Sequence, residues 1–97
     1  MRRVIVQSRF LSEELHSYEA EAKEAFAEGE RVLVFDLGRV RYIDSGATDM
    51  LESLSRDAED RGAVVLLDNL SSVAQEFLAL LGLSQNFFTR LPLKAAR

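Results

Sequence analysis

The sequence predicts an α/β domain with a small, open, mostly parallel or mixed sheet of about four strands covered by three helices. Short apolar runs of β-forming residues alternate along the chain with longer segments whose apolar residues recur every three or four positions. Strands joined through helices are normally parallel, with right-handed crossovers. The 97 residues are expected to form a single domain, 1–97, because a second core would need a longer chain.

The N-terminal third predicts one strand followed by one helix. Apolar β-forming residues begin at Val4, and the strand is expected to extend toward Phe10. Ser12 is the expected helix cap, because the two glutamates that follow it then fall in the first turn, where negative charge suits the helix dipole. Gly29 is placed to end this helix. Its expected apolar stripe consists of Leu15, Tyr18, Ala22, Ala25 and Phe26.

The middle of the chain predicts a buried strand and a second helix. Residues 32–35 are continuously apolar, which indicates a central strand covered on both faces, and Asp36 follows them. Residues 39–43 connect this strand to Asp44-Ser45-Gly46, where the second helix is expected to begin. Gly62 is expected to end that helix. Its apolar face is predicted to comprise Ala47, Met50, Leu51, Leu54 and Ala58.

The last third predicts another buried strand, a third helix and a short edge strand. The buried strand covers residues 63–67 and is closed by Asp68. A capping box starting at Ser72 is expected to begin the helix. The edge strand is expected at residues 86–89. The predicted core-facing residues of the helix are Val73, Phe77, Leu80 and Leu81.

Charge and composition indicate which kinds of partner the protein binds and in which cellular compartment it is found. Twelve basic and sixteen acidic residues give a net charge of −4, which disfavours nucleic acid as a partner. No apolar run approaches the roughly 18 residues that cross a bilayer, and the N-terminal apolar stretch is too short for a signal peptide. The absence of cysteine suits a reducing compartment. We therefore expect a cytoplasmic protein that does not insert into membranes.

Catalytic motifs are missing from the sequence. It contains neither a phosphate-cradling glycine loop nor a nucleophile elbow, and its single histidine, His16, is expected to be a half-exposed helix residue and not a catalytic base. The acids that end the predicted strands, Asp36, Asp44 and Asp68, are single, and the middle of the chain has no lysine to assist them. Turn and helix capping is the favoured role of these acids. No enzyme, metal or cofactor is therefore expected, and a minimal enzyme that uses these acids is the alternative from a different class.

Ser45 lies at the predicted start of the second helix. A hydroxyl there lies beside unpaired backbone N–H groups and the positive end of the helix dipole, which would hold a phosphate. Gly46 has no side chain that could block a partner approaching this hydroxyl. Ser45 is also suited to cap the helix. The roles of phosphate acceptor and helix cap are compatible, and both remain open.

The order and spacing of these segments resemble the STAS domain family, which includes bacterial anti-sigma factor antagonists and the C-terminal domains of sulfate transporters. The resemblance extends over residues 31–88. The matching segments are residues 32–37, 42–46, 61–66, 73–83 and 87–88.

The family signature, Asp-Ser-Ser-Gly-Leu, carries its phosphate acceptor on the second serine, and an ungapped alignment places that acceptor on Gly46. A one-residue deletion fits better, because the apolar ladder that starts at Ala47 and the glycine at Gly62 both come one residue early. The deletion makes Ser45 the phosphoacceptor candidate. Asp44 and Asp49 would repel a phosphate there.

The resemblance implies a regulatory protein-interaction module and not an enzyme. In the antagonist family, the unphosphorylated domain binds an anti-sigma factor of the ATP-binding switch-kinase type, and phosphorylation of the acceptor breaks the complex. The alternatives within the family are a small cytoplasmic subunit that binds the ATPase of a lipid-transport ABC transporter and a stressosome-like scaffold. The partner-binding residues carried over to this chain are Asp44, Ser45, Gly46, Thr48 and Asp49.

The N-terminus departs from the family in a second way. Family members commonly begin with a two-stranded hairpin, whereas this sequence predicts only one strand before the first helix. A sheet that lacks that hairpin has an exposed edge, which favours pairing with another chain. We therefore expect a homodimer or a place in a larger assembly.

Overall fold

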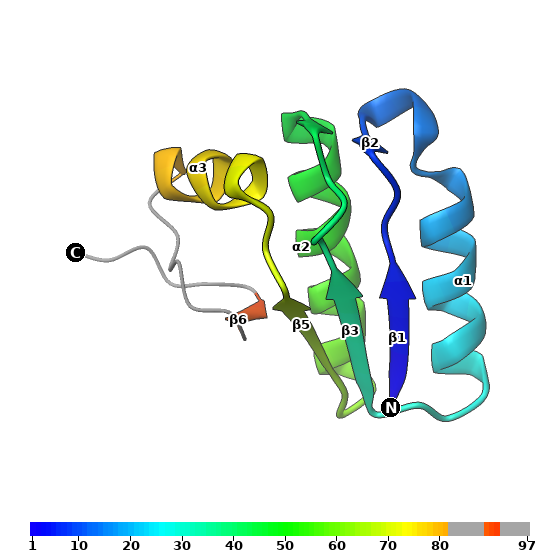
Figure 1. Cartoon of the computed structure of the whole chain (residues 1–97). Coiled ribbons are helices and arrows are strands. Elements are labelled where there is room, and N and C mark those ends of the chain that lie inside the picture. The colour runs from blue at the N-terminus through cyan, green and yellow to red at the C-terminus, as the bar shows by residue number, and fades with distance from the viewer. Residues whose placement is uncertain (82–88, 92–97) are drawn as a thin grey trace.

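The computed structural model describes residues 1–81 and 89–91 and confirms the predicted α/β fold (Figure 1). Strands and helices alternate along most of the chain, as the sequence pattern indicated. The elements are β1 (Arg2–Ile5), β2 (Arg9–Phe10), the 3-10 helix η1 (Ser12–Glu14), α1 (His16–Ala27), β3 (Val32–Asp36), β4 (Tyr42–Ile43), α2 (Ser45–Asp60), β5 (Val64–Asp68), α3 (Ser72–Leu80) and β6 (Thr89–Leu91).

The main sheet has the strand order β1-β3-β5-β6. β3 pairs in parallel with β1 and β5, while β6 pairs antiparallel with β5, which makes the sheet mixed. The predicted final strand is therefore present as β6, whose described residues begin at Thr89; residues 86–88 of that prediction lie outside the described chain. β2 and β4 form a separate two-stranded parallel sheet.

The prediction of a single N-terminal strand was wrong. The chain forms two strands there, β1 and β2, which belong to different sheets and do not pair as a hairpin. Between them the backbone N–H groups of Val6 and Gln7 donate to Asp36 O and to the Tyr18 hydroxyl. The first of these bonds continues the pairing of β1 with β3, whereas the second, to α1, marks where the segment leaves that pairing. β1 forms one edge of the main sheet, as expected for a chain without the hairpin.

Helices α1 and α2 pack against one face of the main sheet and against each other (Figure 1). The predicted inward face of α2 is confirmed, since its five apolar residues are at most 6% exposed. Ala22, Ala25 and Phe26 of α1 are also buried. Gly29 and Gly62 follow the two helices with positive φ angles, +87° and +72°, a conformation that costs glycine little.

The opposite face of the sheet carries a charged bridge. Arg3 of β1 lies beside Val34 in register, so the two side chains share this face. The Arg3 guanidinium reaches across β3, with Nη2 3.2 Å from Asp36 Oδ2 and 2.6 Å from Asp68 Oδ2. Leu33, Val34 and Phe35 are all fully buried, which confirms the burial of β3 on both faces that its continuous apolar run predicted.

Helix α3 differs from its prediction in both its cap and its inward face. Ser71, and not Ser72, caps it, because Ser71 Oγ accepts from Ala74 N at 3.1 Å. The buried residues of the helix are Ala74 and Leu78, whereas Val73, Leu80 and Leu81 are 38%, 85% and 46% exposed. Figure 1 shows α3 beyond the end of β5, beside the sheet and not across it. Only a narrow strip of small and apolar side chains therefore faces the core.

The predicted role of Ser12 as a helix cap was also wrong. Ser12 begins the 3-10 helix η1, while α1 starts at His16, after Leu15, without a side-chain cap. The Ser12 side chain instead bonds to Asp44, more than thirty residues along the chain.

None of the described helices is long and apolar enough to cross a membrane.

Ser55 of α2 generates the first testable prediction. Its hydroxyl lies in the core, 1% exposed, and among the described residues it has no hydrogen-bond partner. We expect Ser55→Ala to raise the free energy of unfolding by about 1 kcal/mol, because alanine favours the helix and removes an unsatisfied polar group. Urea denaturation followed by circular dichroism measures the change.

The matched control is Ser53→Ala, at an exposed position of the same helix. It is expected to add only the difference in helix propensity, about 0.5 kcal/mol. A gain from Ser55→Ala no larger than that of the control would show that the buried hydroxyl carries no penalty.

Candidate functional site

The residues singled out by the sequence gather at one end of the molecule. Figure 1 shows the start of α2, helix α3 and strand β2 together at the end toward which β1, β3 and β5 point. In open α/β sheets, partners and ligands usually meet the carboxyl ends of the strands. The candidate functional surface therefore lies at this end of the molecule.

Asp44 organises the start of α2. It is the N-cap of the helix, with its Oδ1 accepting from Ala47 N at 3.2 Å. The same carboxylate accepts from Ser12 N, at 2.9 Å to Oδ2, and from Ser12 Oγ at 2.8 Å. Hydrogen bonds from the Ser12 backbone, followed by its hydroxyl, lower the pKa of Asp44 below its ordinary value despite partial burial. Asp44 therefore joins η1 to α2 and takes the capping role that the sequence left open for Ser45.

Ser45 is the first residue of α2, and its side chain is exposed. Within the described residues, no hydrogen bond engages its hydroxyl. Its carbonyl oxygen accepts from Thr48 Oγ1 at 2.8 Å. Thr48 is only 8% exposed and so offers a partner little surface, whereas Asp49 is exposed. The surface of the predicted partner-binding set thus consists mainly of Ser45 and Asp49, with Asp44 and Gly46 partly exposed beside them.

Gly46 is required by the close approach of η1. A Cβ atom at this position would overlap Ser12 Oγ and lie 2.9 Å from Ser12 Cβ and 3.3 Å from Asp44 Oδ1. Gly46 therefore leaves space for the segment that Asp44 holds, in addition to leaving Ser45 accessible.

The remaining strand-end acids have structural partners. Asp36 Oδ1 accepts from Gly38 N and from Asn69 Nδ2, both at 3.0 Å, as expected of a turn cap. Burial tends to raise the pKa of Asp36, but these two hydrogen bonds and Arg3 outweigh it and lower the pKa. Asp68 binds Arg3. In residues 1–81 and 89–91, no three His, Cys, Asp or Glu side chains are grouped as a metal site.

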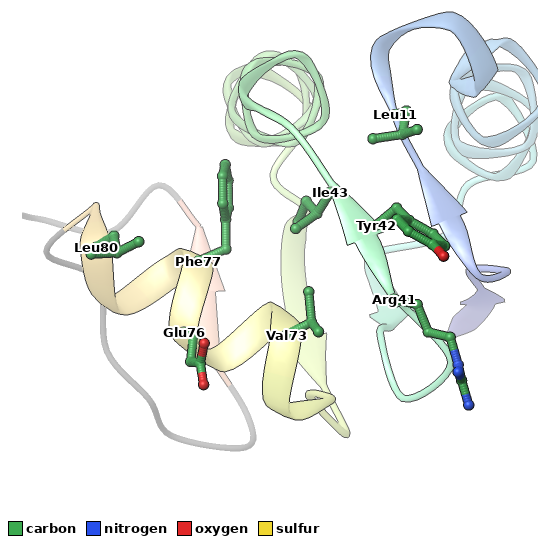
Figure 2. A pocket seen from close by; sticks show the side chains of 8 residues that line it. All are labelled: Leu11, Arg41, Tyr42, Ile43, Val73, Glu76, Phe77 and Leu80. Carbon is green, nitrogen blue, oxygen red and sulfur yellow. The ribbon is translucent and has the colours of Figure 1, made fainter.

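A groove that sequence reasoning missed adjoins this site (Figure 2). It lies between α3 and β4 and has a volume of about 400 Å³. Ile43, on one of its walls, directly precedes Asp44. The apolar periodicity of α3 indicates these residues in the sequence, but it does not show that they face the surface and not the core. The lining residues are Leu11, Arg41, Tyr42, Ile43, Val73, Glu76, Phe77 and Leu80.

Gly46→Ala tests the contact between η1 and α2. Alanine normally favours a helix over glycine, but here its methyl group would collide with Ser12. We expect the free energy of unfolding to fall by about 1–3 kcal/mol, the usual cost of overpacking. Adding Ser12→Gly should recover part of that loss relative to Ser12→Gly alone. A Gly46→Ala variant more stable than wild type would contradict the close approach.

Asp44→Asn tests the charge on the cap. Asparagine keeps the capping geometry but removes the carboxylate, whose folded-state pKa is lowered. A lowered pKa contributes stability above the unfolded value of about 3.9, and this contribution is lost as the pH falls through the folded-state pKa. The variant should therefore be less stable at pH 7, with the difference from wild type closing in acid. Denaturation midpoints between pH 7 and pH 2 measure it, and a constant difference would contradict the assignment.

Comparison with known protein families identifies the family of this chain. A family model described as "Mlab, STAS domain" matches residues 2–92, from β1 through β6. A comparison with curated proteins finds no match. The match covers nearly the whole chain and includes the 31–88 segment on which the resemblance was recognised. The chain therefore belongs to the STAS domain family, whose members are regulatory protein-interaction modules.

Proposed function

We propose that this protein is an anti-sigma factor antagonist that binds a switch-kinase anti-sigma factor through the start of α2, with Ser45 as the switch. The observation that carries the proposal is that one residue caps the helix while its neighbour keeps an exposed hydroxyl. Asp44 caps α2, so the exposed hydroxyl of Ser45 is not needed for capping. It is accessible both to a docking partner and to a kinase.

Charge explains how phosphorylation of Ser45 would release the partner. A phosphate adds about −1.5 to −2 charges at neutral pH. This phosphate would lie next to the Asp44 carboxylate, which already accepts hydrogen bonds from Ser12 and Ala47. Additional negative charge in a close interface opposes a partner fitted to the unmodified surface, and such charge mismatches cost several kcal/mol. The helix start is therefore suited to a switch in affinity.

A second candidate is the small subunit that binds the ATPase of a lipid-transport ABC transporter. The observation that favours it is that Asp44-Ser45-Gly46 contains one serine, whereas the antagonist signature Asp-Ser-Ser-Gly-Leu contains two. Asp44 and Asp49 also disfavour a phosphate on Ser45. In this case Ser45 is never modified and forms part of a permanent docking surface. Both candidates use the same end of the molecule.

Two substitutions of Ser45 test the primary proposal. Ser45→Asp should weaken binding to the anti-sigma factor at least tenfold, whereas Ser45→Ala should bind like wild type but resist phosphorylation by the cognate kinase. Calorimetry with the purified partner and a kinase assay measure the two effects. Ser53→Asp, an exposed position further along α2, is the matched charge control and should leave affinity unchanged.

The partner itself is identified by purifying the tagged, full-length chain from its native cells and analysing bound proteins and Ser45 by mass spectrometry. A switch kinase together with phosphate on Ser45 supports the antagonist function. An ABC transporter ATPase with unmodified Ser45 supports the second candidate. Equal affinity of Ser45→Asp and wild type for either partner would remove the start of α2 from the interface.

A further inference from the structure

Helix α3 presents an apolar stripe to the surface beside the groove. Val73, Phe77 and Leu80 occupy positions i, i+4 and i+7, the spacing by which an amphipathic helix inserts into a groove. Val73 is 38% exposed and Leu80 is 85% exposed. The opposite side of the helix is occupied, since Ala74 and Leu78 are buried in the core. The stripe is thus a second apolar face on a short helix.

The opposite wall of the groove is also apolar. It is formed by Leu11 and by Tyr42 and Ile43 of β4, and Tyr42 is 54% exposed. Figure 2 shows the side chains of Val73 and Ile43 turned toward the space between the two walls. The chain therefore presents two neighbouring apolar walls, the α3 stripe and the β4 side, with the groove between them.

The two walls carry opposite charges. Arg41 lies on the β4 side and Glu76 on the α3 side. Within the described part of the chain, neither of these two side chains forms an ion pair, and the same is true of Arg31, Arg39 and Arg56. A protein partner complementary to this groove must place a negatively charged side chain next to Arg41 and a positively charged one next to Glu76. A second copy of the chain brings both.

We propose that this groove is the interface of a two-fold symmetric homodimer. The α3 stripe of each copy covers the β4 wall of the other, and Arg41 of each copy meets Glu76 of the other. Because a two-fold contact occurs twice, one complementary pair of charges supplies two ion pairs. This interface is distinct from the exposed edge of the main sheet at β1.

Charge-swap variants of the full chain test this interface. Sedimentation velocity over a range of concentrations should show a monomer–dimer equilibrium for wild type. Arg41→Glu or Glu76→Arg alone places like charges opposite each other at two points and should weaken the dimer about tenfold or more. The double variant Arg41→Glu/Glu76→Arg should restore wild-type association. Arg56→Glu, at an exposed position of α2, is the matched control and should have no effect.

Leu80→Asp tests the apolar contact without endangering the fold, because Leu80 is 85% exposed. It should give a monomer whose circular dichroism spectrum matches that of wild type. A wild-type chain that stays monomeric at all concentrations would overturn the proposal, as would a dimer unaffected by Leu80→Asp or single charge variants that the double variant does not rescue. None of these measurements uses Ser45 or a regulatory partner, so their outcome is independent of the proposed function.

Discussion

The candidate functional end of this STAS domain depends on one carboxylate, that of Asp44. Asp44 accepts hydrogen bonds from Ser12 and from the first turn of α2, which joins two segments more than thirty residues apart. The contact brings η1 so close to the helix that only glycine fits at position 46. It also relieves Ser45 of the capping role. The Asp44 carboxylate therefore both holds η1 against α2 and leaves the Ser45 hydroxyl accessible.

The acids at the ends of the strands divide between structure and surface. Asp36 and Asp68 hold Arg3 across β3, and Asp36 also stabilises the turn at Gly38. These contacts stabilise the sheet face that α1 and α2 do not cover. Asp44 and Asp49 remain near the surface at the start of α2, where their charge acts on any group that approaches Ser45. The same residue type therefore supports the fold at one place and sets the electrostatics of the candidate site at another.

Helix α3 connects the fold to the second proposed interface. Because it packs beside β4 at the end of the sheet, its small and narrow inward face suffices to anchor it. Its larger apolar residues remain at the surface, next to Tyr42 and Ile43. The proposed dimer groove and the start of α2 are consecutive along the chain, since Ile43 is followed by Asp44. A regulatory partner and a second copy would thus occupy neighbouring surfaces.

The sequence by itself determined the α/β class, the parallel central strands and the inward face of α2, because continuous apolarity and helical periodicity are local properties that burial on a sheet requires. It also pointed to Asp44-Ser45-Gly46. Only the tertiary structure showed that the N-terminal segment forms two strands and that Ser12 bonds to Asp44. Only the tertiary structure showed that Val73 and Leu80 are exposed. The first two outcomes depend on hydrogen-bond partners distant in sequence, and the third depends on how α3 packs at the end of the sheet. Periodicity shows that a helix has an apolar face, but the packing of the whole chain decides whether that face meets its own core or the surface.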